Sequence, residues 1–353
     1  MTTQKIRDFS ATERSLSIEI AHSPAYELLV RLYVTSDADN LEFEAGEALA
    51  TALEGASPEL RDHLTVAGSS QVWISMIGMA YESGASDIDS FIDHVAGTDP
   101  LVLRERIVSA LSDKLPASGD LAGAVAGDSE AIDRVIEGSC SGDERGALRH
   151  LLEVSPEKTR ETLVDILRRF ADEVFTDSAE VAEILARDAG MKAALASRIA
   201  PEQAIEIATN GIAVDVGTGT TGVVLVPTIA SRPWVIITDS GSLKILCYGA
   251  SAHIEEDPDA PPLWVVKMYK ALGDEKRLRI LGVLKDEPSS LGDLAQRLEL
   301  AKSTVHHHVG MLRDAGLVRV TIGRDKEYSL RTDAVPQAGQ LLEAFLTPTG
   351  GTS

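Results

Sequence analysis

The side chains with the clearest chemistry lie near the end of this 353-residue chain. They comprise a lysine, two hydroxyls and three consecutive histidines: Lys302, Ser303, Thr304, His306, His307 and His308. Apolar residues recur at helical spacing through the same segment, at Val305, Val309 and Leu312, which predicts an amphipathic helix. Ser303, His306, His307 and Gly310 fall on its opposite, outer face. The major groove of DNA admits a short helix whose outer face is small and forms hydrogen bonds. The segment therefore predicts nucleic acid as a partner.

The flanking sequence predicts the elements that would position this helix. Gly316 is expected to end it, and the alternating residues 317–322 and 326–330 predict two strands joined by a tight tip. Upstream, residues 263–288 predict two helices broken at Gly273 and Asp274, and Ser290 is expected to cap a third. The core candidates of the second of these helices are Leu278, Ile280, Leu281 and Leu284. Helices followed by a two-stranded wing form a winged helix-turn-helix.

Residues 263–346 resemble the ArsR/SmtB family of bacterial transcription regulators. The resemblance is carried by ALGDEKRLRILGVL, LGDLAQRLELAKSTVHHHVGMLRDAGLV and GRDKEYSL. It implies a homodimer that binds an inverted repeat in double-stranded DNA and represses transcription, with residues 263–272 and 335–346 as the dimer surface. The positions matching the family's DNA contacts are Lys302, Ser303, Thr304, His306, His307, Arg324 and Lys326. Ala301 departs from the family, which commonly has a capping serine there, so the helix is expected to lack a side-chain cap.

Two features exclude the family's usual metal sites, and a third excludes the histidine triplet as a site. The segment 289–294 contains no cysteine, and residues 332–346 contain no histidine. Successive residues of the histidine triplet point about 100° apart on a helix, whereas ligation from one face needs an i, i+4 spacing. His308 is instead expected to pack inward, hydrogen-bonded and neutral. We therefore predict no metal, no cofactor and no catalytic residue.

The net charge of −22 is distributed unevenly. Residues 262–346 carry 13 Lys and Arg against 11 Asp and Glu, a balance of +2, which leaves −24 for the rest of the chain. Because DNA binding depends on neutralising phosphates, the acidic remainder is expected to face away from DNA. Two cysteines, with no secretory signal and no long apolar run, predict a soluble cytoplasmic protein that does not enter a membrane.

The remainder of the chain predicts an α+β fold that is predominantly helical. Residues 1–210 are expected to form a large helical domain with a sensor or dimerisation role, which leaves room for an unknown small-molecule or protein effector. Residues 211–252 predict a small antiparallel β segment, and the acidic, proline-rich residues 253–262 predict a linker to the winged helix at 263–346.

One rival function is a nucleotide-using enzyme, for which the winged helix would be only a docking module. Residues 213–226 superficially resemble the phosphate-binding hairpin of actin-like ATPases and sugar kinases. Asp215 would hold metal and phosphate there, beside Thr218, Thr220 and Thr221. The sequence DSG at 239–241 follows too closely to leave room for the domain that separates the two phosphate loops in those folds. A turn rich in threonine and glycine also needs no ligand to explain it. Trp73 and Cys140 are expected to lie in a packed core and a loop, respectively.

Overall fold

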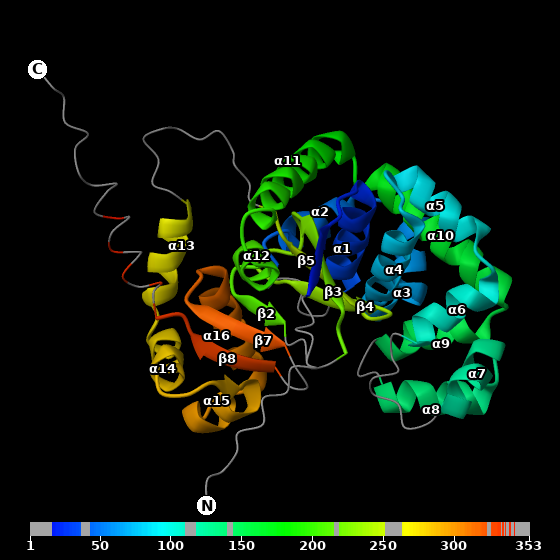
Figure 1. The fold of residues 1–353 in the computed structure, drawn as a ribbon. Helices are drawn as coiled ribbons and strands as arrows, with labels where there is room; N and C mark the ends of the chain where they lie inside the picture. The colour runs from blue at the N-terminus through cyan, green and yellow to red at the C-terminus, as the bar shows by residue number, and fades with distance from the viewer. Residues whose placement is uncertain are drawn as a thin grey trace, which may run out of the picture.

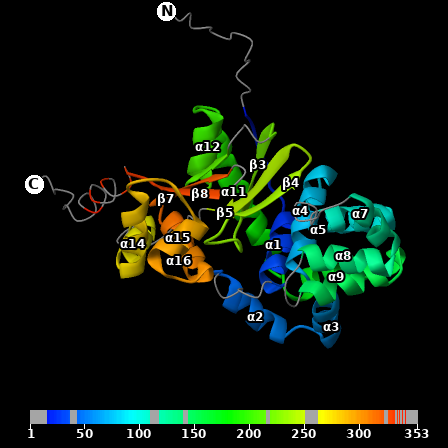
Figure 2. The same ribbon diagram turned by 90° about the horizontal axis from the view of Figure 1, so that it is seen from below.

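The computed structural model describes residues 16–36, 43–109, 118–139, 144–214, 219–250, 263–322 and 326–332, with isolated positions beyond. Residues 16–250 are called the N-terminal body here, and residues 263–330 the C-terminal module. The module lies at one end of the molecule and helices α3 to α10 lie at the other, with a β-sheet between them (Figure 1). Figure 2 shows the same order from below.

Helices make up most of the N-terminal body. They are α1 (Pro24–Ser36), α2 (Gly46–Glu54), α3 (Pro58–Ala67), α4 (Ser70–Ser83), α5 (Ile88–Gly97), α6 (Pro100–Ser109), α7 (Ser118–Ala126), α8 (Ser129–Ser139), α9 (Glu144–Glu153), α10 (Pro156–Glu173), α11 (Ser178–Ala196) and α12 (Pro201–Ala208). The apolar stripe of α10 is buried as its spacing predicts, with Leu163, Leu167 and Phe170 fully enclosed. The predominantly helical α+β class is confirmed.

The sheet of the N-terminal body is mixed, which corrects the expected antiparallel arrangement. Its strands β1 (Ser17–Ile20), β3 (Gly222–Thr228), β5 (Leu243–Gly249) and β4 (Ile236–Ser240) lie in that order. Only β4 and β5 pair antiparallel; β3 pairs in parallel with both β1 and β5. The physical reason is that β3 is buried along its whole length, and a central strand covered on both faces favours parallel partners.

The C-terminal module consists of α13 (Leu263–Leu272), α14 (Glu275–Leu284), β6 (Ser289–Ser290), α15 (Leu291–Leu298), α16 (Lys302–Asp314), β7 (Val318–Ile322) and β8 (Lys326–Leu330). Ser290 caps α15 in a capping box with Asp293, as predicted for the serine. Gly316 adopts a φ of +72°, the left-handed geometry expected after the helix. Leu278 corrects one core prediction, because it is 49% exposed while Ile280, Leu281 and Leu284 are buried. These elements form the predicted winged helix-turn-helix.

The module is joined to the N-terminal body by a shared sheet. Strand β2 (Ile212–Val214) leaves the body and pairs in parallel with β7, giving a second sheet in the order β2-β7-β8-β6. Gly211 precedes β2 with a φ of +110°, and a side chain there would lie 2.7 Å from the carbonyl oxygen of Val318. Only glycine therefore allows the two backbones to approach so closely.

The alternating side chains of the first sheet divide between two cores. Val224, Val226 and Ile245 join the helices of the N-terminal body. Val223, Leu225, Leu246 and Tyr248 on the alternate positions belong to a second cluster, which also holds buried residues of α12 and of the C-terminal module. The body and the module therefore share apolar packing, and the predicted linker at 253–262 lies outside the described residues.

Candidate nucleic-acid interface

Helix α16 presents the polar face that the sequence predicts. Val305, Val309 and Leu312 are buried beneath it, whereas Lys302, Ser303 and His306 are exposed. Thr304 and His307 are half-buried. Ala301 precedes the helix without a side-chain cap, so the first backbone N–H groups receive no protein side-chain acceptor from that position. An exposed lysine and serine at a helix N-terminus are suited to phosphate and base edges.

Of the two DNA contacts predicted in the wing, Lys326 lies within the described residues. Lys326 is exposed at the start of β8 and is paired in register with Ile322 across the hairpin. Arg324, the second predicted wing contact, lies outside the described residues. The structure thus brings Lys302, Ser303, Thr304, His306 and His307 together on one helix.

His308 faces inward from α16, as expected, and is 9% exposed. Its Nδ1 has no hydrogen-bond partner among the residues that the structure describes, which corrects the expectation of a hydrogen-bonded ring. Burial lowers the pKa of this imidazole below its ordinary value, and the nearby Asp274 carboxylate only partly opposes that shift. The ring is therefore held neutral inside the module.

The outer face of α16 is partly covered by Trp234, a residue that the sequence did not single out. Trp234 stacks on His306 with ring centroids 4.7 Å apart and ring planes 6° apart. A Cβ atom added to Gly310, one turn later, would lie 1.9 Å from the Trp234 ring. The glycine therefore provides the space in which the indole lies. The sequence signal that could have indicated this contact is Gly310 itself. A glycine in the middle of a helix costs about 1 kcal/mol relative to alanine, so its presence indicates that packing leaves no room for a side chain.

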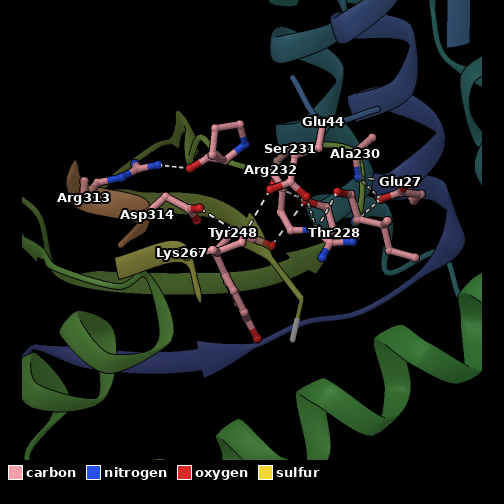
Figure 3. Close-up of polar contacts among 12 residues, drawn as sticks. Glu27, Glu44, Thr228, Ala230, Ser231, Arg232, Tyr248, Lys267, Arg313 and Asp314 are labelled. Atoms are coloured by element: carbon pink, nitrogen blue, oxygen red, sulfur yellow. Dashed lines mark hydrogen bonds and ion pairs between the residues drawn. The ribbon is translucent and has the colours of Figure 1, made fainter. Parts of the chain in front are cut away.

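Polar contacts extend this seam between body and module. The Arg313 guanidinium donates a hydrogen bond to the carbonyl oxygen of Pro233, the residue before Trp234. Lys267 of α13 bridges the Asp314 carboxylate at 3.0 Å and the Glu44 carboxylate at 3.1 Å (Figure 3). Asn210 donates from its side chain to the carbonyl oxygen of Arg313 at 2.9 Å. The end of α16 is thus bonded to the N-terminal body from several sides.

The segment that carries Trp234 is anchored at its other end on α1. Buried Glu27 accepts hydrogen bonds from the backbone N–H groups of Ile229 at 2.7 Å and Ala230 at 3.1 Å (Figure 3). The Arg31 guanidinium lies 3.1 Å from the same carboxylate and compensates its charge. Residues 229–235 therefore connect α1, to which their first residues are hydrogen-bonded, with the outer face of α16.

The phosphate-binding hairpin of the rival function is not formed. Strands β2 and β3, which flank the glycine- and threonine-rich segment, belong to different sheets and do not pair with each other. Asp215 and Thr218 lie outside the described residues, while the Thr221 hydroxyl lies 2.7 Å from that of Ser242. Two strands that continue into separate sheets cannot form the hairpin that holds phosphate in those folds. The nucleotide hypothesis for 213–226 is therefore corrected.

Two other residues of chemical interest, Trp73 and Cys247, lie in packed surroundings. Trp73 is fully buried in the core of the N-terminal body, as expected. Cys247 is buried in the sheet, and its burial raises the pKa of the thiol well above the ordinary value. Cys140 lies outside the described residues. Within the described ranges there is neither a cluster of three potential metal-binding side chains nor a helix with the length and apolarity to cross a bilayer.

A recognition-type helix behind a helical turn, followed by a two-stranded wing, defines a winged helix-turn-helix protein. The same segment matches a helix-turn-helix domain family over residues 272–321. It is 45% identical over 53 residues to the transcriptional activator HlyU of Vibrio cholerae, covering 15% of this chain and 49% of HlyU. It is 37% identical over 84 residues to the HTH-type transcriptional regulator CmtR of Mycobacterium tuberculosis, covering 23% of this chain and 71% of CmtR.

Through this segment, the chain belongs to the ArsR/SmtB family of helix-turn-helix transcription regulators. The solved structure of reduced HlyU from Vibrio cholerae N16961 is 32% identical, with 24% of this chain and 92% of that chain covered and a TM-score of 0.20. In the sequence comparison, this chain spans about half the length of HlyU, and the matching residues lie in the C-terminal segment of this chain.

Proposed function

We propose that this protein is a sequence-specific DNA-binding transcription regulator, acting in the cytoplasm, that binds an inverted-repeat operator as a homodimer and represses transcription. The observation that carries the proposal is the exposed N-terminal half of α16, where Lys302 and Ser303 are free of protein cover. In a winged helix-turn-helix, this end of the second helix enters the major groove.

The proposed division of labour follows the chemistry of each side chain. Lys302, together with Lys326 and Arg324 of the wing, would neutralise phosphates and so set the affinity for any sequence. Ser303, His306 and His307 would meet base edges and set the sequence preference, with Thr304 at the border of the contact. Relatives named as transcription regulators support the assignment for this segment.

The N-terminal body is proposed to control access to the reading face. Trp234 lies over His306 and beside Gly310, so duplex DNA that reached this part of α16 would have to displace the indole. The docked arrangement would therefore bind DNA less tightly than one in which residues 229–235 have moved away. An effector that acts on the body would regulate DNA binding through this displacement.

The dimer is proposed to form through α13 and residues 335–346, as the family resemblance implies. Tyr269 on α13 and Leu278 on α14 are 41% and 49% exposed, so this end of the module carries apolar surface that a second copy can cover. A two-fold dimer would place two recognition helices about 34 Å apart, one turn of DNA.

A gel shift with the DNA upstream of the protein's own gene tests the proposal, alongside an assay of ATP hydrolysis. We expect a sequence-specific shift that unrelated DNA of equal length does not compete, and no ATP turnover. ATP turnover without any shift would favour an enzyme instead.

A further inference from the structure

The seam between the body and the module contains a small, partly open cavity that is lined by cationic side chains and by no carboxylate of the described residues. Its volume is about 70 Å³, and residues from both parts line it, among them Trp234, Val309, Gly310, Arg313, Lys326 and Tyr328. This volume corresponds to about two water molecules at the density of the liquid, and the cavity opens to solvent on one side, which leaves room for a larger ligand to extend outward. The exposed lining is about equally polar and apolar, and it includes two cationic side chains, Arg313 and Lys326.

Arg313 is the buried member of that cationic pair, at 7% exposure. Its guanidinium donates to the Pro233 carbonyl oxygen, but Nε, which is enclosed by protein, has no hydrogen-bond partner within the described ranges. Among the residues that the structure describes, no carboxylate lies within ion-pair distance of this guanidinium. Burial lowers the pKa of Arg313 to about 10, with Asp314 opposing the shift, so the group still carries its charge at neutral pH.

Another buried arginine shows how the chain satisfies such a charge elsewhere. Arg104 is fully buried, and its guanidinium donates to the Thr159 hydroxyl and to the carbonyl oxygens of Leu151, Val125 and Val154. By comparison, the Arg313 guanidinium has a single hydrogen-bond acceptor in the part of the chain that the structure describes. Because buried donors are normally satisfied, so few acceptors around a buried charge that lines a cavity indicate a place for an anion beside it.

Lys326 adds a second positive charge at the same cavity. Desolvation lowers the pKa of its ammonium group, and the positive charges of Arg313 and Lys244 lower it further. Lys244 is paired with Asp239 at 2.9 Å, whereas Lys326 has no ion pair within the described part of the chain. An anion in the cavity would relieve the repulsion between Lys326 and Arg313.

We propose that this cavity binds a small carboxylate with a short apolar tail, whose oxygens accept hydrogen bonds from the Arg313 guanidinium and the Lys326 ammonium group. Charge-assisted hydrogen bonds from arginine are well suited to carboxylates, and the apolar half of the lining can cover a tail that an inorganic anion lacks. The inference goes beyond the proposed function, because it assigns a ligand class and a place for it.

The location of the cavity also gives the ligand a regulatory effect, which rests on the proposed function. The ligand would contact α16 and β8 on one side and the Trp234 segment on the other, so it would stabilise the docked arrangement. A ligand that favours the docked state would weaken DNA binding by the same free energy with which it discriminates between the two states.

Isothermal titration calorimetry of the full-length protein at constant ionic strength tests the site without DNA. The probe is sodium butyrate, with butyramide as its neutral counterpart and inorganic phosphate as an anion without a tail. We expect saturable butyrate binding in the millimolar range and weaker binding of both comparison compounds. Absence of saturable butyrate binding, or equally tight binding of butyramide or phosphate, would overturn the assignment.

Two variants locate the binding. Lys326 is exposed, so Lys326→Met is expected to fold. The variant should bind butyrate roughly tenfold more weakly or worse, because it loses one charge-assisted hydrogen bond. Lys158→Met on α10 is the matched control, because that lysine is 62% exposed and lies in the N-terminal body. Unchanged butyrate binding in Lys326→Met would contradict the site.

The regulatory effect has its own measurement. Butyrate should lower the affinity of the wild-type protein for its operator and should have less effect on Trp234→Ala, whose docked state lacks the indole. If the protein binds no DNA, the calorimetry still decides the site, so failure of the proposed function and failure of this inference are distinguishable. Operator binding unaffected by saturating butyrate would contradict the regulatory role.

Discussion

Trp234 of the N-terminal body and His306 of the recognition-type helix stack with their ring planes 6° apart and their centroids 4.7 Å apart. This contact joins a loop after β3 to a side chain that the sequence assigns to DNA. It means that the reading face of α16 serves two partners, the protein's own body and, by our proposal, a duplex. The competition between them yields the first predictions.

Removing the indole should favour DNA. Trp234→Ala is expected to raise operator affinity about threefold to tenfold, because an aromatic pair contributes roughly 0.5–1.5 kcal/mol beyond its buried area. Trp234→Phe keeps an aromatic ring and should lie between the variant and the wild type. Fluorescence anisotropy with labelled operator gives the affinities, and lower affinity in Trp234→Ala would show that the indole assists DNA binding.

Gly310 offers an independent way to displace the same indole. The Cβ of Gly310→Ala would lie 1.9 Å from the Trp234 ring, so the ring must move and operator affinity should rise. In the Trp234→Ala background, the same substitution should instead stabilise the protein by up to about 1 kcal/mol, the helix preference for alanine over glycine. Urea unfolding of the four proteins measures the coupling. Equal effects of Gly310→Ala in both backgrounds would show that Trp234 and Gly310 do not interact.

Lys302 and His307 should affect DNA binding in different ways. Lys302→Ala is expected to weaken binding to all DNA sequences alike. It should also reduce the slope of log affinity against log salt concentration by about 0.9, the effect of one lost phosphate contact. His307→Ala should change the preference among operator variants, by about 1–3 kcal/mol at the affected base pair. Anisotropy titrations at several salt concentrations separate the two. A sequence-dependent effect of Lys302→Ala would reverse these assignments.

The buried imidazole of His308 should make the module sensitive to acid. Its pKa is lowered in the folded state, so the unfolded chain binds a proton more readily. This contribution to stability is therefore fully present above the ordinary histidine pKa of about 6.5 and is lost as the pH falls through the lower, folded-state pKa. The difference in unfolding free energy between the wild type and His308→Gln should shrink or reverse on acidification from pH ~7.5 to ~5.5. A difference independent of pH would contradict this account.

The local rules of the sequence predicted the C-terminal module well. Ser290 begins a helix and Gly316 ends one because capping and left-handed geometry depend on neighbouring residues. Leu278 was misplaced because helical spacing defines a face but does not show which part of it finds a covering partner. The alternation of residues 318–322 was enough to identify the wing strand.

The arrangement around that module depends on contacts between distant parts of the chain. Strand β2 pairs with β7, about a hundred residues later, and no local pattern encodes such a partner. The continuous apolar run of β3 did carry a signal for a buried parallel strand, which was interpreted as part of an antiparallel meander. Trp234 was missed because, as with β2 and β7, its partners are distant in sequence: His306 and Gly310 lie more than seventy residues away.

The central claim is that α16 reads DNA and that Trp234 limits its access. Selection of bound duplexes from a random-sequence library, performed in parallel with the wild type and Trp234→Ala, tests both parts directly. We predict that both proteins enrich the same inverted repeat, with half-sites about one helical turn apart, and that Trp234→Ala binds it more tightly. Failure of both proteins to enrich any sequence would contradict the claim.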